Sequence, residues 1–370
     1  MSRFVTRSAL VAMALLAAIA IQFASGGVRP AEAQAAGVTV QVGSGEPGYA
    51  VNLFGSPKVT VAAGSTLTFK NPWLEPHTVT FPGATKLPPP SDPKAPVPTD
   101  PGKTVAYDGV AYLNSGFLFK DQTFALSLPT KGTYKFYCII HPGMEGSVDV
   151  VDAGSASIST QAQLDAAATK TFADATAALK AASAAETAKG ATRTANADGT
   201  STWTVNVGGM VGPSDLQQFY APKLDIRVGD TVVWKSAVPT PHTATFLGGT
   251  AMPLPPTPEN PKVMQATPAL AAGYSGTGYL NSGIIGVGWP AQQYSTKFAA
   301  AGSFPYICVL HVDQGMGGVV NVAAAQVTPA RTGTGGADAA STASLALQVI
   351  AAVAAIAAVA GARRSTLRSR

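Results

Sequence analysis

Short segments of alternating hydrophobic and polar residues fill two long stretches of the chain, residues 37–152 and 200–325. In the first stretch, the segments Val38–Val42, Thr66–Phe69 and Ser147–Val151 alternate, and turns rich in glycine and proline separate them. Alternation with a period of two predicts β-strands that have one buried face. Many short strands of this kind predict an all-β Greek-key sandwich, and the stretch is long enough to bury its own core.

The second stretch repeats the pattern of the first. Its segments Thr202–Val207, Leu224–Val228 and Thr231–Trp234 follow the same strand–turn–strand order. Two pairs of equivalent residues measure the repeat. The histidines at 77 and 242 lie 165 positions apart, and the cysteines at 138 and 308 lie 170 apart. A small drift over so long a period predicts a tandem duplication of whole domains with loop insertions.

The segment between these stretches, residues 153–199, has a different composition. Ser159–Lys189 is rich in alanine, contains no proline or glycine, and is followed by Gly190. This composition predicts a helical linker with a glycine C-cap. One face of that helix carries a narrow apolar stripe formed by Leu164, Ala168, Phe172, Ala175 and Leu179. The helix either lies along a sandwich face or acts as a spacer between the domains.

The N-terminal residues 1–36 resemble a targeting segment. Arg3 and Arg7 precede an apolar run, and small residues near Ala31 and Ala33 suit cleavage. This arrangement predicts a signal peptide and an exported protein, with an uncleaved anchor as the weaker alternative.

The C-terminal region predicts a membrane anchor. Residues 326–341 form a polar tether, and residues 342–362 are uncharged and long enough to span a bilayer. The basic tail, residues 363–370, stays cytoplasmic by the positive-inside rule, which places both domains on the extracytoplasmic side of the cell membrane. A cell-wall sorting signal is the alternative, although Pro329–Gly333 matches such a motif poorly.

Charge argues against a nucleic-acid partner. The formal net charge is +5, but seven arginines and Glu32 belong to the two terminal segments. Without them, 18 basic and 19 acidic side chains remain, so the domains are close to neutral. No basic patch interleaved with aromatic residues predicts binding to DNA or RNA.

Two loops carry the candidate chemistry. Each contains a cysteine, a histidine and a methionine, and each follows a lone histidine by some sixty positions. Two histidines, one cysteine and a weak axial methionine form the ligand set of a blue-copper centre. Zinc fits less well because thioether is a poor zinc ligand. The predicted metal ligands are His77, Cys138, His141 and Met144 in the first half, and His242, Cys308, His311 and Met316 in the second.

Both halves resemble cupredoxins of the plastocyanin, amicyanin and pseudoazurin type. The spacing Cys138-x₂-His141-x₂-Met144 resembles that of amicyanin, and Cys308-x₂-His311-x₄-Met316 resembles that of plastocyanin. The resemblance implies two cupredoxin sandwiches, each with a copper ion. It also implies that the loop histidines, His141 and His311, reach the surface as electron ports.

The chain departs from the cupredoxin pattern beside the strand histidine. Family members commonly carry asparagine directly after it, where it ties the two ligand loops together, whereas this chain has Thr78 and Thr243. The apolar loop residues Pro142 and Val312 would suit a weak docking patch for redox proteins.

These observations predict a membrane-anchored electron-transfer protein with two type 1 copper centres. An enzyme of the multicopper oxidase or nitrite reductase kind is not expected, because such enzymes need further histidines and all four are already used. A copper-binding or copper-handling surface protein without a redox partner is the alternative. The different loop lengths predict different reduction potentials, with one domain as the entry and the other as the exit.

Overall fold

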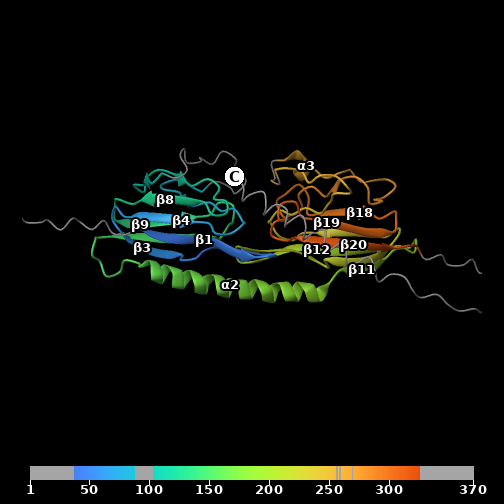
Figure 1. Cartoon of the computed structure of the whole chain (residues 1–370), viewed down its shortest axis with the longest axis horizontal. Helices are drawn as coiled ribbons and strands as arrows, with labels where there is room; N and C mark the ends of the chain where they lie inside the picture. The colour runs from blue at the N-terminus through green and yellow to red at the C-terminus, as the bar shows by residue number, and fades with distance from the viewer. Residues whose placement is uncertain (1–36, 88–102, 256, 258–259, 269, 326–370) are drawn as a thin grey trace, which may run out of the picture.

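The computed structural model describes residues 37–87, 103–255, 257, 260–268 and 270–325. Two β-sandwiches lie side by side along the long axis of the molecule, and a long helix runs beneath both of them (Figure 1). We call residues 37–152 domain 1 and residues 200–325 domain 2. Each domain has its own core of buried aliphatic and aromatic side chains, as the alternating pattern predicts.

The strands of domain 1 are β1 (Val38–Glu46), β2 (Tyr49–Phe54), β3 (Lys58–Ala62), β4 (Thr66–Lys70), β5 (Thr80–Phe81), β6 (Val105–Ala106), β7 (Leu113–Asn114), β8 (Thr123–Ser127), β9 (Gly132–Tyr137) and β10 (Glu145–Val151). The segment between the domains contains α2 (Gln161–Lys189) and β11 (Thr192–Ala195). Domain 2 contains β12 (Ser201–Val211), β13 (Ser214–Tyr220), β14 (Lys223–Arg227), β15 (Thr231–Lys235), β16 (Thr245–Phe246), α3 (Pro261–Met264), β17 (Leu280–Asn281), β18 (Gln293–Lys297), β19 (Gly302–Ile307) and β20 (Gly317–Ala323).

The two domains have equivalent strand orders. One sheet of domain 1 runs β3-β10-β9-β5-β7, and its counterpart in domain 2 runs β14-β20-β19-β16-β17. The other sheet is shared between the domains. Its order is β18-β15-β12-β13-β2-β1-β4-β8-β6, with β11 paired to β12.

The shared sheet is joined by β2 and β13, which pair antiparallel with Ala50 opposite Asp215 and Tyr49 opposite Leu216. Each of these strands is the second strand of a hairpin, β1–β2 in domain 1 and β12–β13 in domain 2. Since the two hairpins are equivalent and pair antiparallel, the domains are arranged about an approximate twofold axis.

Helix α2 lies along both domains, so the sandwich-face alternative holds. Thr160 caps its N-terminus in a capping box with Gln163, and Gly190 follows its last residue. Four members of the predicted stripe are buried and Ala175 is partly buried. Phe172 and Leu179 share a small core with Val51 of β2 and Leu216 of β13, so the helix covers the junction between the domains.

The predicted signal peptide (1–36), tether (326–341), membrane helix (342–362) and basic tail (363–370) lie outside the described residues. Among the residues that the structure describes, no helix is both long and apolar enough to cross a membrane.

Candidate metal centres

The first candidate centre gathers His77, Cys138 and His141. Their ligand atoms all lie within 4.8 Å of one another, and the group is buried. His77 Nδ1 lies 3.1 Å from His141 Nδ1, and Cys138 Sγ lies 3.4 Å from the same His141 nitrogen. Cys138 follows β9 directly, and His77 lies just before β5, where its backbone pairs with Leu118. The centre therefore lies at one end of the sandwich.

Met144 completes the first loop. Its backbone carbonyl accepts a hydrogen bond from Cys138 N (2.9 Å), and its own N–H donates to His141 O (3.0 Å). These bonds close a tight loop between β9 and β10. The Met144 side chain is buried in the domain core next to Cys138.

The second candidate centre repeats this arrangement with His242, Cys308 and His311. Cys308 Sγ lies 3.4 Å from His311 Nδ1, and Cys308 N donates to the carbonyl of Met316 (3.0 Å). Both ring nitrogens of His242 are buried without a hydrogen-bond partner. A buried polar atom normally has a partner, so Nδ1 of His242 is placed as a metal ligand would be.

A glycine holds each strand histidine from behind. Gly43 and Gly208 sit at β-bulges of β1 and β12 with φ of +72° and +69°. A Cβ at these positions would lie 2.1 Å from His77 Nε2 and 2.2 Å from His242 Nε2. Only glycine allows this close approach, which leaves Nδ1 of each ring facing the centre. Neither glycine is predicted from the sequence as part of a site, because an isolated glycine in a strand indicates only a close backbone approach.

Thr78 and Thr243 connect the histidine segment to the cysteine loop. The Thr78 N–H donates to Cys138 Sγ (3.3 Å), and its hydroxyl accepts from Ile139 N (2.9 Å). Thr243 makes the same contacts with Cys308 Sγ (3.3 Å) and Val309 N (2.9 Å). The threonines thus tie the two ligand segments together, the role that the resemblance assigns to asparagine.

The surroundings of the two threonine hydroxyls differ. Thr243 Oγ1 lies 2.9 Å from Thr245 Oγ1, which is 2.8 Å from Asn281 Oδ1. In domain 1 the corresponding distance from Thr78 Oγ1 to Thr80 Oγ1 is 3.5 Å, and the hydroxyl lies 3.7 Å from Cys138 Sγ. The hydroxyl therefore faces the sulfur more closely in the first centre.

Electrostatics favour a thiolate in both centres. Burial raises the pKa of Cys138 and Cys308, but the charges and hydrogen bonds of the neighbouring imidazoles outweigh it and hold each pKa well below its usual value. Burial opposes charge on His311 as well, yet the Cys308 thiolate raises the pKa of this imidazole to about 9. For His77, burial is the largest effect and lowers its pKa. Thiolate and imidazole are the soft donors that copper prefers.

The loop histidines do not form surface ports, which corrects the expectation drawn from the resemblance. His311 is 4% exposed, and the His141 side chain is 10% exposed. The hairpin tip of each domain covers the loop of the other. A Cβ on Gly143 would lie 3.7 Å from Pro213 Cβ, and one on Gly315 would lie 3.7 Å from Pro47 Cβ. The two candidate centres therefore face the junction between the domains.

Hydrogen bonds between backbone atoms and between side chains stabilise this junction. Gly48 N donates to the carbonyl of Gln314 in the second loop (2.9 Å), and Gln217 N donates to Gly48 O (2.9 Å). Asn52 of β2 donates its side-chain N–H to Asp215 of β13 (2.6 Å). Burial raises the pKa of Asp215 above its ordinary value, although nearby imidazoles and Thr240 oppose this effect.

One buried carboxylate, Glu75, joins the two loops. Its Oε1 lies 3.5 Å from His141 Nε2, and its Oε2 accepts from the side-chain amides of Gln217 (2.7 Å) and Gln314 (3.4 Å). Burial would raise the pKa of Glu75, but the hydrogen bond to His141 and the field of His311 and the other imidazoles lower it to about 2. Glu75 is not predicted from the sequence as part of a site, since its only signal is a glutamate two positions before His77.

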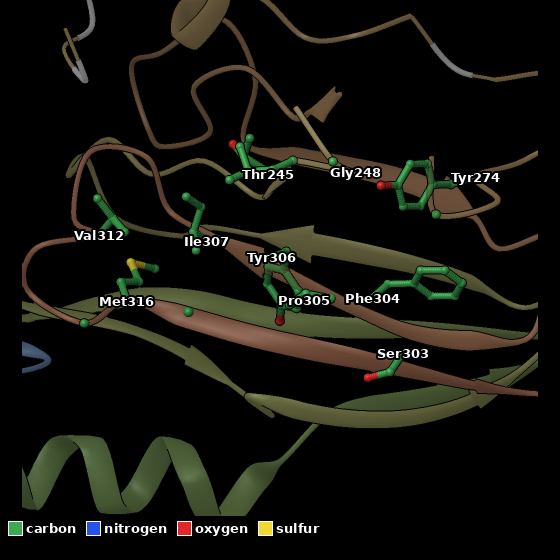
Figure 2. Close-up of a pocket in the computed structure, with 15 residues that line it drawn as sticks. Thr245, Gly248, Tyr274, Ser303, Phe304, Pro305, Tyr306, Ile307, Val312 and Met316 are labelled. Atoms are coloured by element: carbon green, nitrogen blue, oxygen red, sulfur yellow. The ribbon is translucent and has the colours of Figure 1, made fainter. Parts of the chain in front are cut away.

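Domain 2 has an open groove beside its candidate centre. Val312 and Met316 of the second loop lie at one end of it, and Tyr274 and Phe304 lie at the other (Figure 2). Val312 is partly buried, and in domain 1 Pro142 is exposed. The second loop is therefore accessible from the surface through this groove, whereas His311 itself is buried.

Comparison with known proteins identifies the first domain. Residues 46–151 match the family described as copper binding proteins, plastocyanin/azurin family. The chain is 34% identical to Plastocyanin A/B of Petroselinum crispum over 113 residues, which are 30% of this chain and 97% of the plastocyanin. It is 33% identical to Plastocyanin A'/A'' of Nicotiana tabacum over 115 residues, which are 30% of this chain and 99% of that protein.

Solved structures of amicyanin mutants are also similar to this chain. An oxidized mutant is 23% identical, with 31% of this chain and 82% of the amicyanin covered and a TM-score of 0.22. A reduced mutant is 24% identical, with 33% and 95% covered and a TM-score of 0.21.

Proposed function

Because the chain belongs to the plastocyanin/azurin family of copper-binding proteins, we propose that it is an electron-transfer protein with two type 1 copper centres, one in each domain. The observation that carries this proposal is the second group of His242, Cys308 and His311, which repeats the geometry of the first. Copper bound at such a site supplies one-electron redox chemistry between Cu(I) and Cu(II).

The residues of each centre have distinct roles in this proposal. In domain 1, His77, Cys138, His141 and Met144 would hold the copper ion, with the thioether of Met144 as the weakest of the four donors. In domain 2, the same roles fall to His242, Cys308, His311 and Met316. Seven of these eight side chains are buried and that of His141 is 10% exposed, which limits the access of water. The N–H groups of the threonines donate to each sulfur, a contact that tunes the reduction potential.

We propose that the protein is not an enzyme. The chain contains four histidines, and the two centres use all of them, so none is left for a catalytic copper with imidazole ligands. We further propose a redox protein as the external partner. The groove of Figure 2 is the candidate docking surface for domain 2, because Val312, Gly315 and Met316 of the second loop line it.

The terminal segments support a location outside the cytoplasm. We propose that residues 1–36 direct export and that residues 342–362 anchor the protein in the cell membrane, with both domains on the extracytoplasmic side. Protease accessibility of the two domains on intact cells tests this topology. Digestion that requires permeabilised cells would contradict it.

The copper content and visible spectrum of the purified protein test the function. We expect two coppers per chain with an intense thiolate-to-Cu(II) band that is bleached and restored by reversible one-electron redox reagents. Cys138→Ser and Cys308→Ser should each lose one copper and about half of the band.

Other results would redirect the assignment. A colourless protein that binds one copper or none would leave only a pair of structural domains. Two coppers that cannot be cycled between redox states would favour copper handling without a redox partner.

A further inference from the structure

The carboxylate of Glu75 lies between the two centres, at the junction of the domains. Glu75 is 7% exposed, and three donors from different elements converge on it: His141 Nε2, Gln217 Nε2 and Gln314 Nε2. Two of the three donors belong to domain 2, whereas Glu75 belongs to domain 1. A carboxyl group that accepts at both oxygens and donates to none is ionised, so this site holds a buried negative charge.

The position of this charge is not symmetric. Glu75 contacts His141, a predicted ligand of the first centre, at 3.5 Å. Its field also acts on His311, but its hydrogen-bond contact with the second loop is to the neutral amide of Gln314, whose backbone N–H donates to His311 O (3.2 Å). The equivalent position in domain 2 is Thr240, whose hydroxyl donates to Asp215.

Asp215 is the other buried acid at the junction. Its two oxygens accept from Asn52 and Thr240, and neither of these is a predicted ligand. The charge in direct contact with a ligand imidazole is thus that of Glu75.

We propose that Glu75 sets the order of the two reduction potentials, lower in the first centre and higher in the second, so that electrons pass from domain 1 to domain 2. This inference rests on the proposed function. A negative charge beside a centre favours its oxidised state, and the effect is larger at the centre that the charge contacts, because Coulomb interactions weaken with distance. The transfer moves one electron: the first centre is oxidised as the second is reduced, and no bond or proton moves.

Glu75 is also part of a chain of contacts that connects the two centres. The contacts run from His141 to Glu75 (3.5 Å), from Glu75 to Gln314 (3.4 Å), and from Gln314 to His311 (3.2 Å). One feature opposes the order. The Thr78 hydroxyl faces Cys138 Sγ at 3.7 Å, and donation to the thiolate raises the potential of the first centre. This contact is long and involves a neutral group, so the full charge of Glu75 outweighs it.

Redox titrations of the copper-loaded full chain test the proposal. Cys308→Ser leaves the first centre and Cys138→Ser leaves the second, which assigns each potential. We expect the first centre to have the lower potential. Glu75→Gln should raise the potential of the first centre more than that of the second and narrow the gap, because it removes the charge at nearly the same volume. Glu46→Gln, the same change at the β1–β2 hairpin, should move neither potential.

Copper content and absorption, measured on the same samples, separate this proposal from the proposed function. If the wild-type chain shows no blue centres, the proposed function fails. If both centres are blue and the first has the higher potential, the proposed order is overturned, whether or not Glu75→Gln folds. An unchanged gap in a blue Glu75→Gln variant would also overturn the role of Glu75.

Discussion

The first and second centres share their donor groups, and each has a glycine, Gly43 or Gly208, packed against its strand histidine, yet their surroundings differ. The first loop has two residues between His141 and Met144, and the second has four between His311 and Met316. The longer loop supplies Gln314, the side chain that reaches across the junction to Glu75. The difference in spacing leaves the donor set unchanged, but it gives the second loop the side chain that contacts Glu75 across the junction.

The comparison teaches that two levels of structure control these sites. Local elements determine the donor geometry, because a bulge glycine, a threonine and a tight loop recur in both domains. The junction determines the electrostatics, because Glu75 and Asp215 have no symmetric counterparts, with Thr240 and Ala50 at the equivalent positions. Changes at the first level should abolish a centre, and changes at the second should adjust it.

The largest effect is expected from substitution of Gly43 or Gly208, the glycines packed against the strand histidines. Gly43→Ala places a methyl group against His77 Nε2 and strains a backbone with φ of +72°, so the ring must move out of the first centre. We expect this variant to lose the copper of the first centre and about half of the blue band, while Gly208→Ala loses the copper of the second.

Copper analysis and absorption spectra of these variants check the prediction. Gly64→Ala is the matched control, because its φ of +80° carries the same strain while no atom lies within 4 Å of the added Cβ. It should cost about 1 kcal/mol of stability and keep both coppers. Retention of two blue centres in Gly43→Ala would show that the ring is not held from this side.

An intermediate effect is expected for Glu75 in the metal-free protein. Its pKa is lowered from 4.5 to about 2, so its contribution to stability is present above pH 4.5 and is lost as the pH falls towards 2. A shift of this size corresponds to on the order of 3 kcal/mol. Glu75→Gln lacks this contribution, so the free energies of unfolding of the two proteins should converge as the pH falls.

Urea unfolding of both metal-free proteins between pH 2 and pH 6 measures this difference. This range contains the ordinary pKa of a glutamate, 4.5, and the lowered pKa of Glu75, about 2. Glu46→Gln should follow the wild-type curve across the whole range. If the difference between wild type and Glu75→Gln stays constant with pH, the charge of Glu75 does not stabilise the junction.

The smallest effect is expected from the threonines. Thr78→Val removes the acceptor of Ile139 N, and Thr243→Val removes the acceptor of Val309 N together with the short contact to Thr245. An unsatisfied buried N–H costs about 1–3 kcal/mol, and the extra contact adds about 0.5–1 kcal/mol in domain 2. Thermal unfolding of the metal-free variants should therefore show the larger loss for Thr243→Val. Equal losses would mean that the Thr245 contact contributes nothing.

The sequence by itself predicted the donor set and part of the strands. Cysteine, histidine and methionine at fixed spacing on one loop are brought together by local hydrogen bonds, and alternation marks a strand that has one buried face. The helix was predictable for the same reason, because its propensity and its caps are local properties. Only its position along both domains required the structure.

The tertiary structure alone decided the junction. Strands β2 and β13 were not predictable from the sequence pattern, because Tyr49–Phe54 and Ser214–Tyr220 are buried with little alternation. These two strands join the domains, and the junction buries His311 and leaves the His141 side chain 10% exposed, although the resemblance placed both histidines at the surface. Whether the loop histidines His141 and His311 face solvent or the other domain depends on contacts between residues more than a hundred positions apart. No local pattern encodes such contacts, so Glu75 and Gln314 become partners only in the folded chain.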